Sequence, residues 1–128
     1  MPRLTTETFA TGDQSWLGSD HGIGNARTET INVSAFTAGT HYPDGFIRSG
    51  QPVAKVAGLL VPYDATEATV TGAGVLAGHI LTDQRVSGTA NIPAPLLDHG
   101  RVKAALVPGT FVKPAAAAKL SATTIVYI

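Results

Sequence analysis

The sequence predicts a mainly β fold of the α+β class: one small, compact domain of short strands with a single short helix near its C-terminal end. Three observations lead to this prediction. The 128 residues are enough for one domain and too few for two. Short apolar segments alternate with turns that contain Gly or Pro along most of the chain. Only residues 114–120 combine a first-turn proline with strong helix formers.

Residues 1–27 are predicted to form an extended N-terminal arm, and residues 28–128 a single β-rich domain. The arm is rich in Thr, Gly, Asp and Ser, and it has neither a helical nor a strand period. Its isolated large apolar residues are Phe9, Trp16, Leu17 and Ile23. Because such side chains on a polar arm gain much from burial in a partner, we expect them to be anchors. The alternative is that they pack onto the chain's own core.

The domain is predicted to begin with a half-buried strand at 28–35, where apolar and polar residues alternate. Residues 38–45 then carry turn chemistry. Further short strands are expected at 46–48, 53–56, 59–63, 74–81, 100–104 and 123–128. Strands of this length and spacing are typical of a small barrel-like or sandwich core.

Glycine and proline give positional information at three points. Gly78 lies inside an apolar run, where it permits close backbone packing or a bulge. Pro93 and Pro95 cannot donate a backbone hydrogen bond, so segment 91–97 should lie at a sheet edge or begin a strand. Pro114 starts the predicted helix, which at roughly two turns is only marginally stable alone.

The charge composition argues against a nucleic-acid or membrane partner. Nine basic residues balance nine acidic ones, and no Lys/Arg run interleaves with aromatic residues as a nucleic-acid groove would require. No segment approaches the roughly 20 apolar residues that span a bilayer, and the start lacks a signal-peptide pattern, so synthesis in a cytoplasm is expected.

With only 14% charged residues, part of the surface should be covered by an oligomer or a partner. The alternative is that small neutral residues simply dominate.

No catalytic, metal or cofactor site is expected. The four histidines, which are the best candidates for such a site, are His21, His41, His79 and His99. None has another His at metal-ligand spacing, and the chain has no cysteine. One alternative is a small enzyme in which His79 or His99 works with Asp83 or Asp98 as an acid-base pair.

Two other local patterns also fail their chemical requirements. Ser15 does not stand in the Gly-x-Ser-x-Gly spacing of a hydrolase nucleophile. Gly18, Gly22 and Gly24 lack the preceding strand and following helix of a phosphate-binding loop.

Several short segments of the chain are similar to segments that occur in the same order in one protein family. The first is Glu7-Thr8-Phe9, followed by a polar stretch. In the domain they are the Ser-Gly-x-Pro turn at 49–52, the Val-Pro-Tyr-Asp element at 61–64, the Ala-Gly-Val-Leu stretch at 73–76, Leu-Asp-His-Gly at 97–100, the helix at 114–120 and the strand at 123–128. Over most of its length the chain thus resembles the phage head decoration proteins, which include the lambda-type head-stabilising protein. Segment 28–45 is longer than its counterpart in that family.

The resemblance implies a β-tulip-like fold and a role as a virion structural protein that is not an enzyme. It implies a homotrimer at threefold positions on the outer surface of the expanded phage head, bound to the major capsid protein and stabilising the shell against genome pressure. The arm would then add a strand to the capsid subunit. The alternative is another phage structural subunit, such as a tail-tube or head-completion protein.

Overall fold

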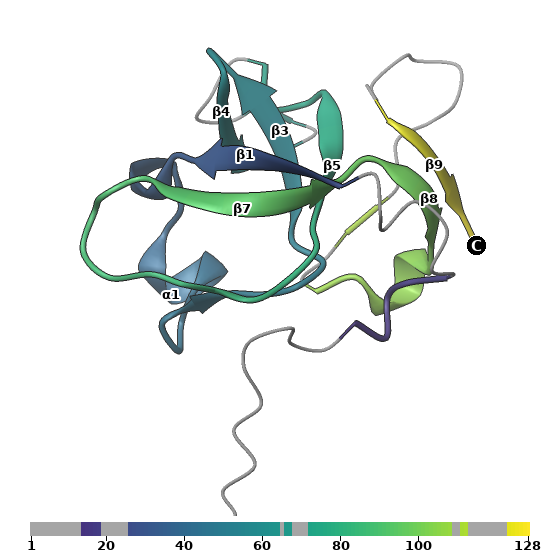
Figure 1. Ribbon diagram of the computed structural model, residues 1–128, viewed down its shortest axis with the longest axis horizontal. Coiled ribbons are helices and arrows are strands. Elements are labelled where there is room, and N and C mark those ends of the chain that lie inside the picture. The colour runs from purple at the N-terminus through teal and green to yellow at the C-terminus, as the bar shows by residue number, and fades with distance from the viewer. Residues whose placement is uncertain (1–13, 19–25, 65, 68–71, 109–110, 113–122) are drawn as a thin grey trace, which may run out of the picture.

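The computed structural model describes residues 14–18, 26–64, 66–67, 72–108, 111–112 and 123–128. Its centre is a closed barrel with the strand order β1-β4-β3-β5-β7 (Figure 1). The barrel strands are β1 (Arg27–Ile31), β3 (Pro52–Val56), β4 (Leu59–Pro62), β5 (Leu76–Ile80) and β7 (Ile92–Leu97). The predicted mainly β fold is therefore confirmed.

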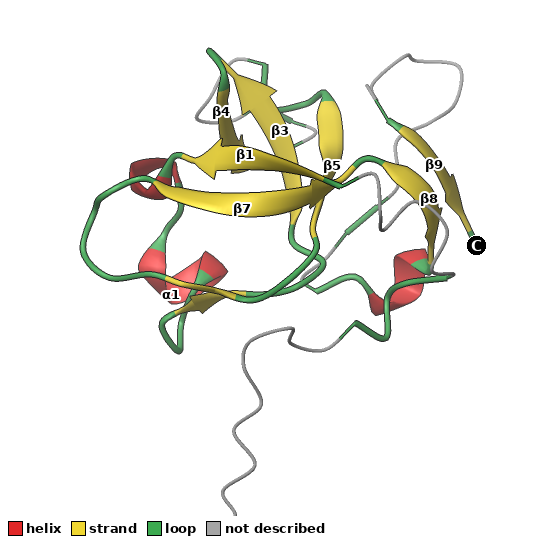
Figure 2. Ribbon diagram, viewed as in Figure 1, coloured by secondary structure: helices red, strands yellow, loops and turns green. Residues whose placement is uncertain are grey.

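The remaining elements are short (Figure 2). Two further strand pairs are β2 (Phe46–Ile47) with β6 (Gln84–Arg85), and β8 (His99–Val102) with β9 (Thr124–Tyr127). The helical elements are η2 (Val33–Ala35), α1 (Ala38–His41) and η3 (Ala104–Leu106). Within the ranges that the structure describes, no helix has both the length and the apolar character that crossing a bilayer requires.

Strands β3 and β4 form a hairpin whose two turn residues are Ala57 and Gly58. Both have positive φ, 52° and 82°, which is the requirement of the two-residue turns that match strand twist. The hairpin pairs Val56 with Leu59 next to the turn. The bend expected at Gly58 is thus a tight hairpin within the barrel.

Gly78 allows the barrel to close between β5 and its two neighbours. A Cβ at this position would lie 2.3 Å from the Leu97 carbonyl oxygen, and its φ of 151° is a conformation that side chains rarely adopt. The β3–β5 register shifts next to it, between Val53 and Ala54. The predicted close packing and bulge are both present.

Pro93 and Pro95 lie where β7 has β1 as its only ladder partner. They pair in register with Thr30 and Thr28, whereas β5 pairs with β7 only at Leu96 and Leu97. The Pro95 carbonyl oxygen accepts the Leu81 amide just beyond β5, so the missing Pro95 donor lies on the β5 side, where the ladder between β5 and β7 ends. The segment is therefore not an edge strand as predicted but a barrel strand between β5 and β1, with both prolines in the part before its register with β5 begins.

Two apolar clusters make up most of the core. The first fills the barrel and consists of Ile31, Val33, Phe36, Ile47, Val53, Leu60, Ile80, Ala94 and Leu96. The second lies between the barrel and β8–β9 and consists of Trp16, Leu81, Leu97, Val102 and Val107, with Leu17, Phe111, Ile125 and Tyr127 packed against it. The chain thus has one barrel core and one junction core.

The predicted arm boundary at residue 27 is wrong for the described part of that segment. Trp16 is 1% exposed inside the junction core, and Leu17 forms an antiparallel bridge with Val102. Arg27 already belongs to β1. Residues 14–18 are therefore part of the folded domain. Burial of the large indole ring of Trp16 stabilises the packing of this segment, although the residues around it are mostly polar.

Three further expectations differ from the structure or fall outside it. The first strand ends at Ile31, and η2 follows where the strand was expected to continue. Residues 38–41, expected as a turn, form the short helix α1. The helix predicted at 114–120 lies outside the described residues.

Candidate functional site

A three-stranded ladder joins the segment 16–18 to β8 and β9. The Gly18 amide donates to the Arg101 carbonyl oxygen at 2.8 Å, and the Lys103 amide donates to the Trp16 carbonyl at 2.7 Å. On its other side β8 pairs in parallel with β9. No strand in the described part of the chain pairs with the second edge of β9. Among the described residues this edge of β9 is therefore open.

The inner side of this ladder packs against the junction core. Leu17, Ile125 and Tyr127 are partly buried there, beside the fully buried Val102. Successive side chains of a strand point to opposite sides, so the residues between them face outward.

The outer side of the ladder carries exposed apolar side chains. Val126 and Ile128 are 56% and 58% exposed, and Arg101 lies opposite Val126 in the register. A Cβ on Gly18 would lie 2.9 Å from Ile128 Cδ1 and 3.0 Å from Arg101 Cβ, so these residues meet over Gly18. Leu106, 50% exposed, belongs to η3, whose first residue, Ala104, donates its amide to the Ile128 carbonyl.

We call Gly18, Arg101, Leu106, Val126 and Ile128 the outer face. Its strand has a recognisable sequence pattern, because all residues from 125 to 128 are apolar. A strand that is apolar on both sides is typical of one covered on both sides. The strand was predicted, but this two-sided pattern was the signal that sequence reasoning missed.

His79 holds the inner side of β9 to the barrel. Its side chain is fully buried, with Nδ1 2.9 Å from the Gly50 carbonyl oxygen and Nε2 2.7 Å from the Tyr127 hydroxyl. A carbonyl oxygen can only accept, so Nδ1 carries the proton and Nε2 accepts from Tyr127. The Trp16 and Phe111 rings flank the imidazole at centroid distances of 5.6 and 5.3 Å.

Burial determines the protonation of this pair. It lowers the pKa of His79 to about 4, against the opposing effect of the hydrogen bond with Gly50. Burial also raises the pKa of Tyr127, and the nearby Tyr63 adds to that shift. At neutral pH both groups are uncharged, and both nitrogens of the imidazole are already bonded. The arrangement is suited to holding β9 in place.

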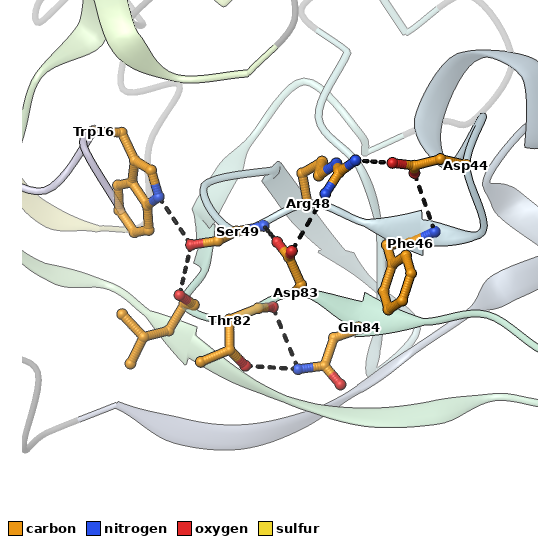
Figure 3. Close-up of polar contacts among 9 residues, drawn as sticks. Trp16, Asp44, Phe46, Arg48, Ser49, Thr82, Asp83 and Gln84 are labelled. Atoms are coloured by element: carbon orange, nitrogen blue, oxygen red, sulfur yellow. Dashed lines mark hydrogen bonds and ion pairs between the residues drawn. The ribbon is translucent and has the colours of Figure 1, made fainter. Parts of the chain in front are cut away.

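A polar network fixes Trp16 in the junction core (Figure 3). The indole Nε1 donates to Ser49 Oγ at 3.0 Å, and that hydroxyl donates to the Leu81 carbonyl at 2.7 Å. The Ser49 amide donates to Asp83 Oδ1 at 2.6 Å. A Cβ on the next residue, Gly50, would lie 2.8 Å from the indole ring. The predicted turn at 49–52 is thus shaped around Trp16.

These positions correct the expected anchor residues. Trp16 is buried in its own chain and Leu17 packs on the inner side of the ladder, so the alternative of packing on the core holds for both. Phe9 and Ile23 lie outside the described residues. Residues 14–18 contribute to the outer face through Gly18.

Of the proposed acid-base residues, His79 and Asp83 are hydrogen-bonded to other groups. His79 bonds to Gly50 and Tyr127, whereas Asp83 accepts from Ser49 and from Arg48. His41 Nδ1 accepts the amide of Thr37 beside α1, and burial lowers its pKa. His99 is partnered, and His21 lies outside the described residues.

The described residues form an open groove but no cluster of metal-ligating side chains. Within the described ranges, no three His, Cys, Asp or Glu side chains gather closely enough to hold a metal ion. An open groove of about 670 Å³ lies between the α1 region and the residues Pro108, Phe111 and Val112. Arg48 lines this groove, and its guanidinium group forms ion pairs with Asp44 and Asp83.

Comparisons with known proteins found no match, whether with family models, with curated proteins or with solved structures.

Proposed function

We propose that this chain is a virion structural protein of a tailed phage: a capsid decoration protein that binds as a homotrimer at threefold positions on the outside of the expanded head. The observation that carries the proposal is the outer face, an exposed apolar surface beside an open strand edge on a small domain with 14% charged residues. Such surfaces mark sites of protein contact. The order of segments that resembles decoration proteins adds to this support.

The proposed mechanism is thermodynamic linkage. A trimer that contacts several capsid subunits in the spacing of the expanded shell binds that state and not the compact precursor. Its binding free energy then stabilises the expanded shell against the pressure of the packed genome. This mechanism requires no chemical step, which agrees with the structural use of the His79 imidazole.

The proposal is tested by light scattering and cosedimentation. The purified chain is expected to have three times the mass of one copy, or to reach it on the heads, and to bind expanded, undecorated heads saturably. Unexpanded heads of the same phage are the matched control and should bind at least about tenfold less protein at the same concentration. A stable ring of another order that binds neither kind of head would favour a tail-tube or head-completion subunit.

A further inference from the structure

The outer face has the properties of a surface that is covered in the working protein. Its strand, β9, has an edge that no described strand pairs with, and residues 124–128 contain no charged side chain and no proline. Natural proteins protect open edges with charges, prolines or bulges, because an unprotected apolar edge pairs with other chains. Val126, Ile128 and Leu106 are three of the five large apolar side chains that are most exposed in the described part of the chain.

The charges that border this face indicate what covers it. Arg101 and Lys103 are both exposed, at the middle and the end of the β8 side of the ladder. A complementary surface therefore has an apolar centre with a carboxylate at its border.

The chain itself carries a surface of that kind. Val75, 41% exposed, stands just before β5. Beside it is the exposed Glu67, whose Oε2 accepts the Gly74 amide at 3.0 Å and is thereby held next to Val75. Figure 1 shows that β5 and β9 belong to different parts of the molecule, the barrel and the outlying pair. Tyr127 on the inner side of β9 bonds to His79 of β5, so Val126 and Ile128 on the other side point away from β5, and this surface does not cover the outer face of the same copy.

We infer that the outer face of one copy docks on the Val75–Glu67 surface of a second copy, with Val126 and Ile128 against Val75 and with Arg101 and Lys103 toward Glu67. The two surfaces differ, so the contact is head-to-tail, and such contacts form a closed ring when the rotation between copies closes. Three copies form the proposed homotrimer, and the inference rests on that part of the proposed function.

The first test compares two valines by sedimentation equilibrium of the full chain. Val126→Asp places a carboxylate in the centre of the contact and should raise the dissociation constant of the trimer by at least about 100-fold. The matched control is Val112→Asp at a side chain that is 78% exposed and lies on neither surface, and this variant should remain a trimer. Circular dichroism verifies that both variants fold. A wild-type monomer at every concentration, or a Val126→Asp trimer, overturns the inference.

The second test reverses the border charges. Arg101→Glu and Glu67→Lys should each raise the dissociation constant by about three- to tenfold, and the double variant should recover most of this loss. Glu67→Gln keeps an acceptor for the Gly74 amide and separates the charge effect from that local bond. A double variant at least as weak as the two losses combined overturns the pairing of these charges.

The failure of this inference is distinguishable from the failure of the decoration role. Mass is measured on the free protein, whereas decoration is measured by head binding. A trimer that dissociates in Val126→Asp but never binds heads supports the contact and refutes decoration. If the trimer binds heads and Val126→Asp leaves the trimer intact, decoration is supported and the proposed contact is refuted.

Discussion

The Tyr127 hydroxyl donates to His79 Nε2 at 2.7 Å, and this bond ties β9 to the barrel strand β5. The same imidazole donates from Nδ1 to Gly50 in the turn that encloses Trp16. One buried side chain thus connects the barrel, the ladder segment at 16–18 and β9. The outer face depends on this junction, because Val126 and Ile128 are presented by the strand that Tyr127 anchors.

Replacing Tyr127 by Phe should destabilise the fold without changing its shape. The substitution leaves the buried Nε2 of His79 without its donor, which costs about 1–3 kcal/mol in the free energy of unfolding. Urea denaturation measures this loss. Val112→Ala at an exposed position is the control and should change stability by less than about 0.5 kcal/mol. Equal stability of Tyr127→Phe and the wild type would mean that the bond contributes nothing.

The free energy of unfolding should decrease as the pH is lowered, over a range that the protonation of His79 determines. Its pKa is about 4 in the folded chain and 6.5 when unperturbed, so between these values the unfolded state binds more protons. The free energy of unfolding therefore decreases as pH falls from 6.5 to about 4, by about 3 kcal/mol from this group, and the contribution then stays constant. Urea denaturation across this range measures the slope. An NMR titration in which the His79 imidazole protonates near pH 6.5 would contradict the prediction.

Two serines provide a matched test of the Trp16 network. Ser49→Ala removes the acceptor of the Trp16 indole and the donor to Leu81 in a buried site, and should cost about 2–4 kcal/mol. Ser34 bonds to Asn32 on the surface, so Ser34→Ala should cost less than about 0.5 kcal/mol. Thermal or urea unfolding of both variants decides the point, and comparable losses would contradict the role assigned to Ser49.

Two glycines test the closure of the barrel. Gly78→Ala forces a Cβ to within 2.3 Å of the Leu97 carbonyl at a positive φ, and should cost more than about 3 kcal/mol. Nothing lies within 4 Å of a Cβ at Gly39 in the helix α1, so Gly39→Ala should be neutral or stabilise by up to about 1 kcal/mol. Expression as a folded protein and its melting temperature are the measurements. A Gly78→Ala variant as stable as the wild type would show that the strands can separate without cost.

Truncations should locate the boundary between arm and domain. Removing residues 1–13 should keep the fold and, under the proposed function, abolish binding to expanded heads. Removing residues 1–27 also deletes Trp16 and Arg27, and should cost at least about 3 kcal/mol because it empties a large site in the junction core. Circular dichroism and cosedimentation separate the two effects. Unchanged head binding by the shorter deletion would refute a role for the arm.

Local signals in the sequence were sufficient to predict the class of fold and several of its elements. The hairpin around Gly58, the turn at Ser49, the close approach at Gly78 and the last strand all correspond to observed features. Each depends on backbone preferences or on alternation over a few neighbouring residues, which a single sequence displays directly.

Tertiary structure alone decided which residues form the junction core and the outer face. Trp16 is buried through contacts with Ser49 and His79, which are 33 and 63 positions away, and no local pattern encodes such partners. Likewise, β-branched and aromatic residues predicted a final strand, but only its pairing with β8 determined that Tyr127 points to His79 while Val126 faces outward. The physical reason is that strand period is a local property, whereas burial depends on what the rest of the chain places on each side.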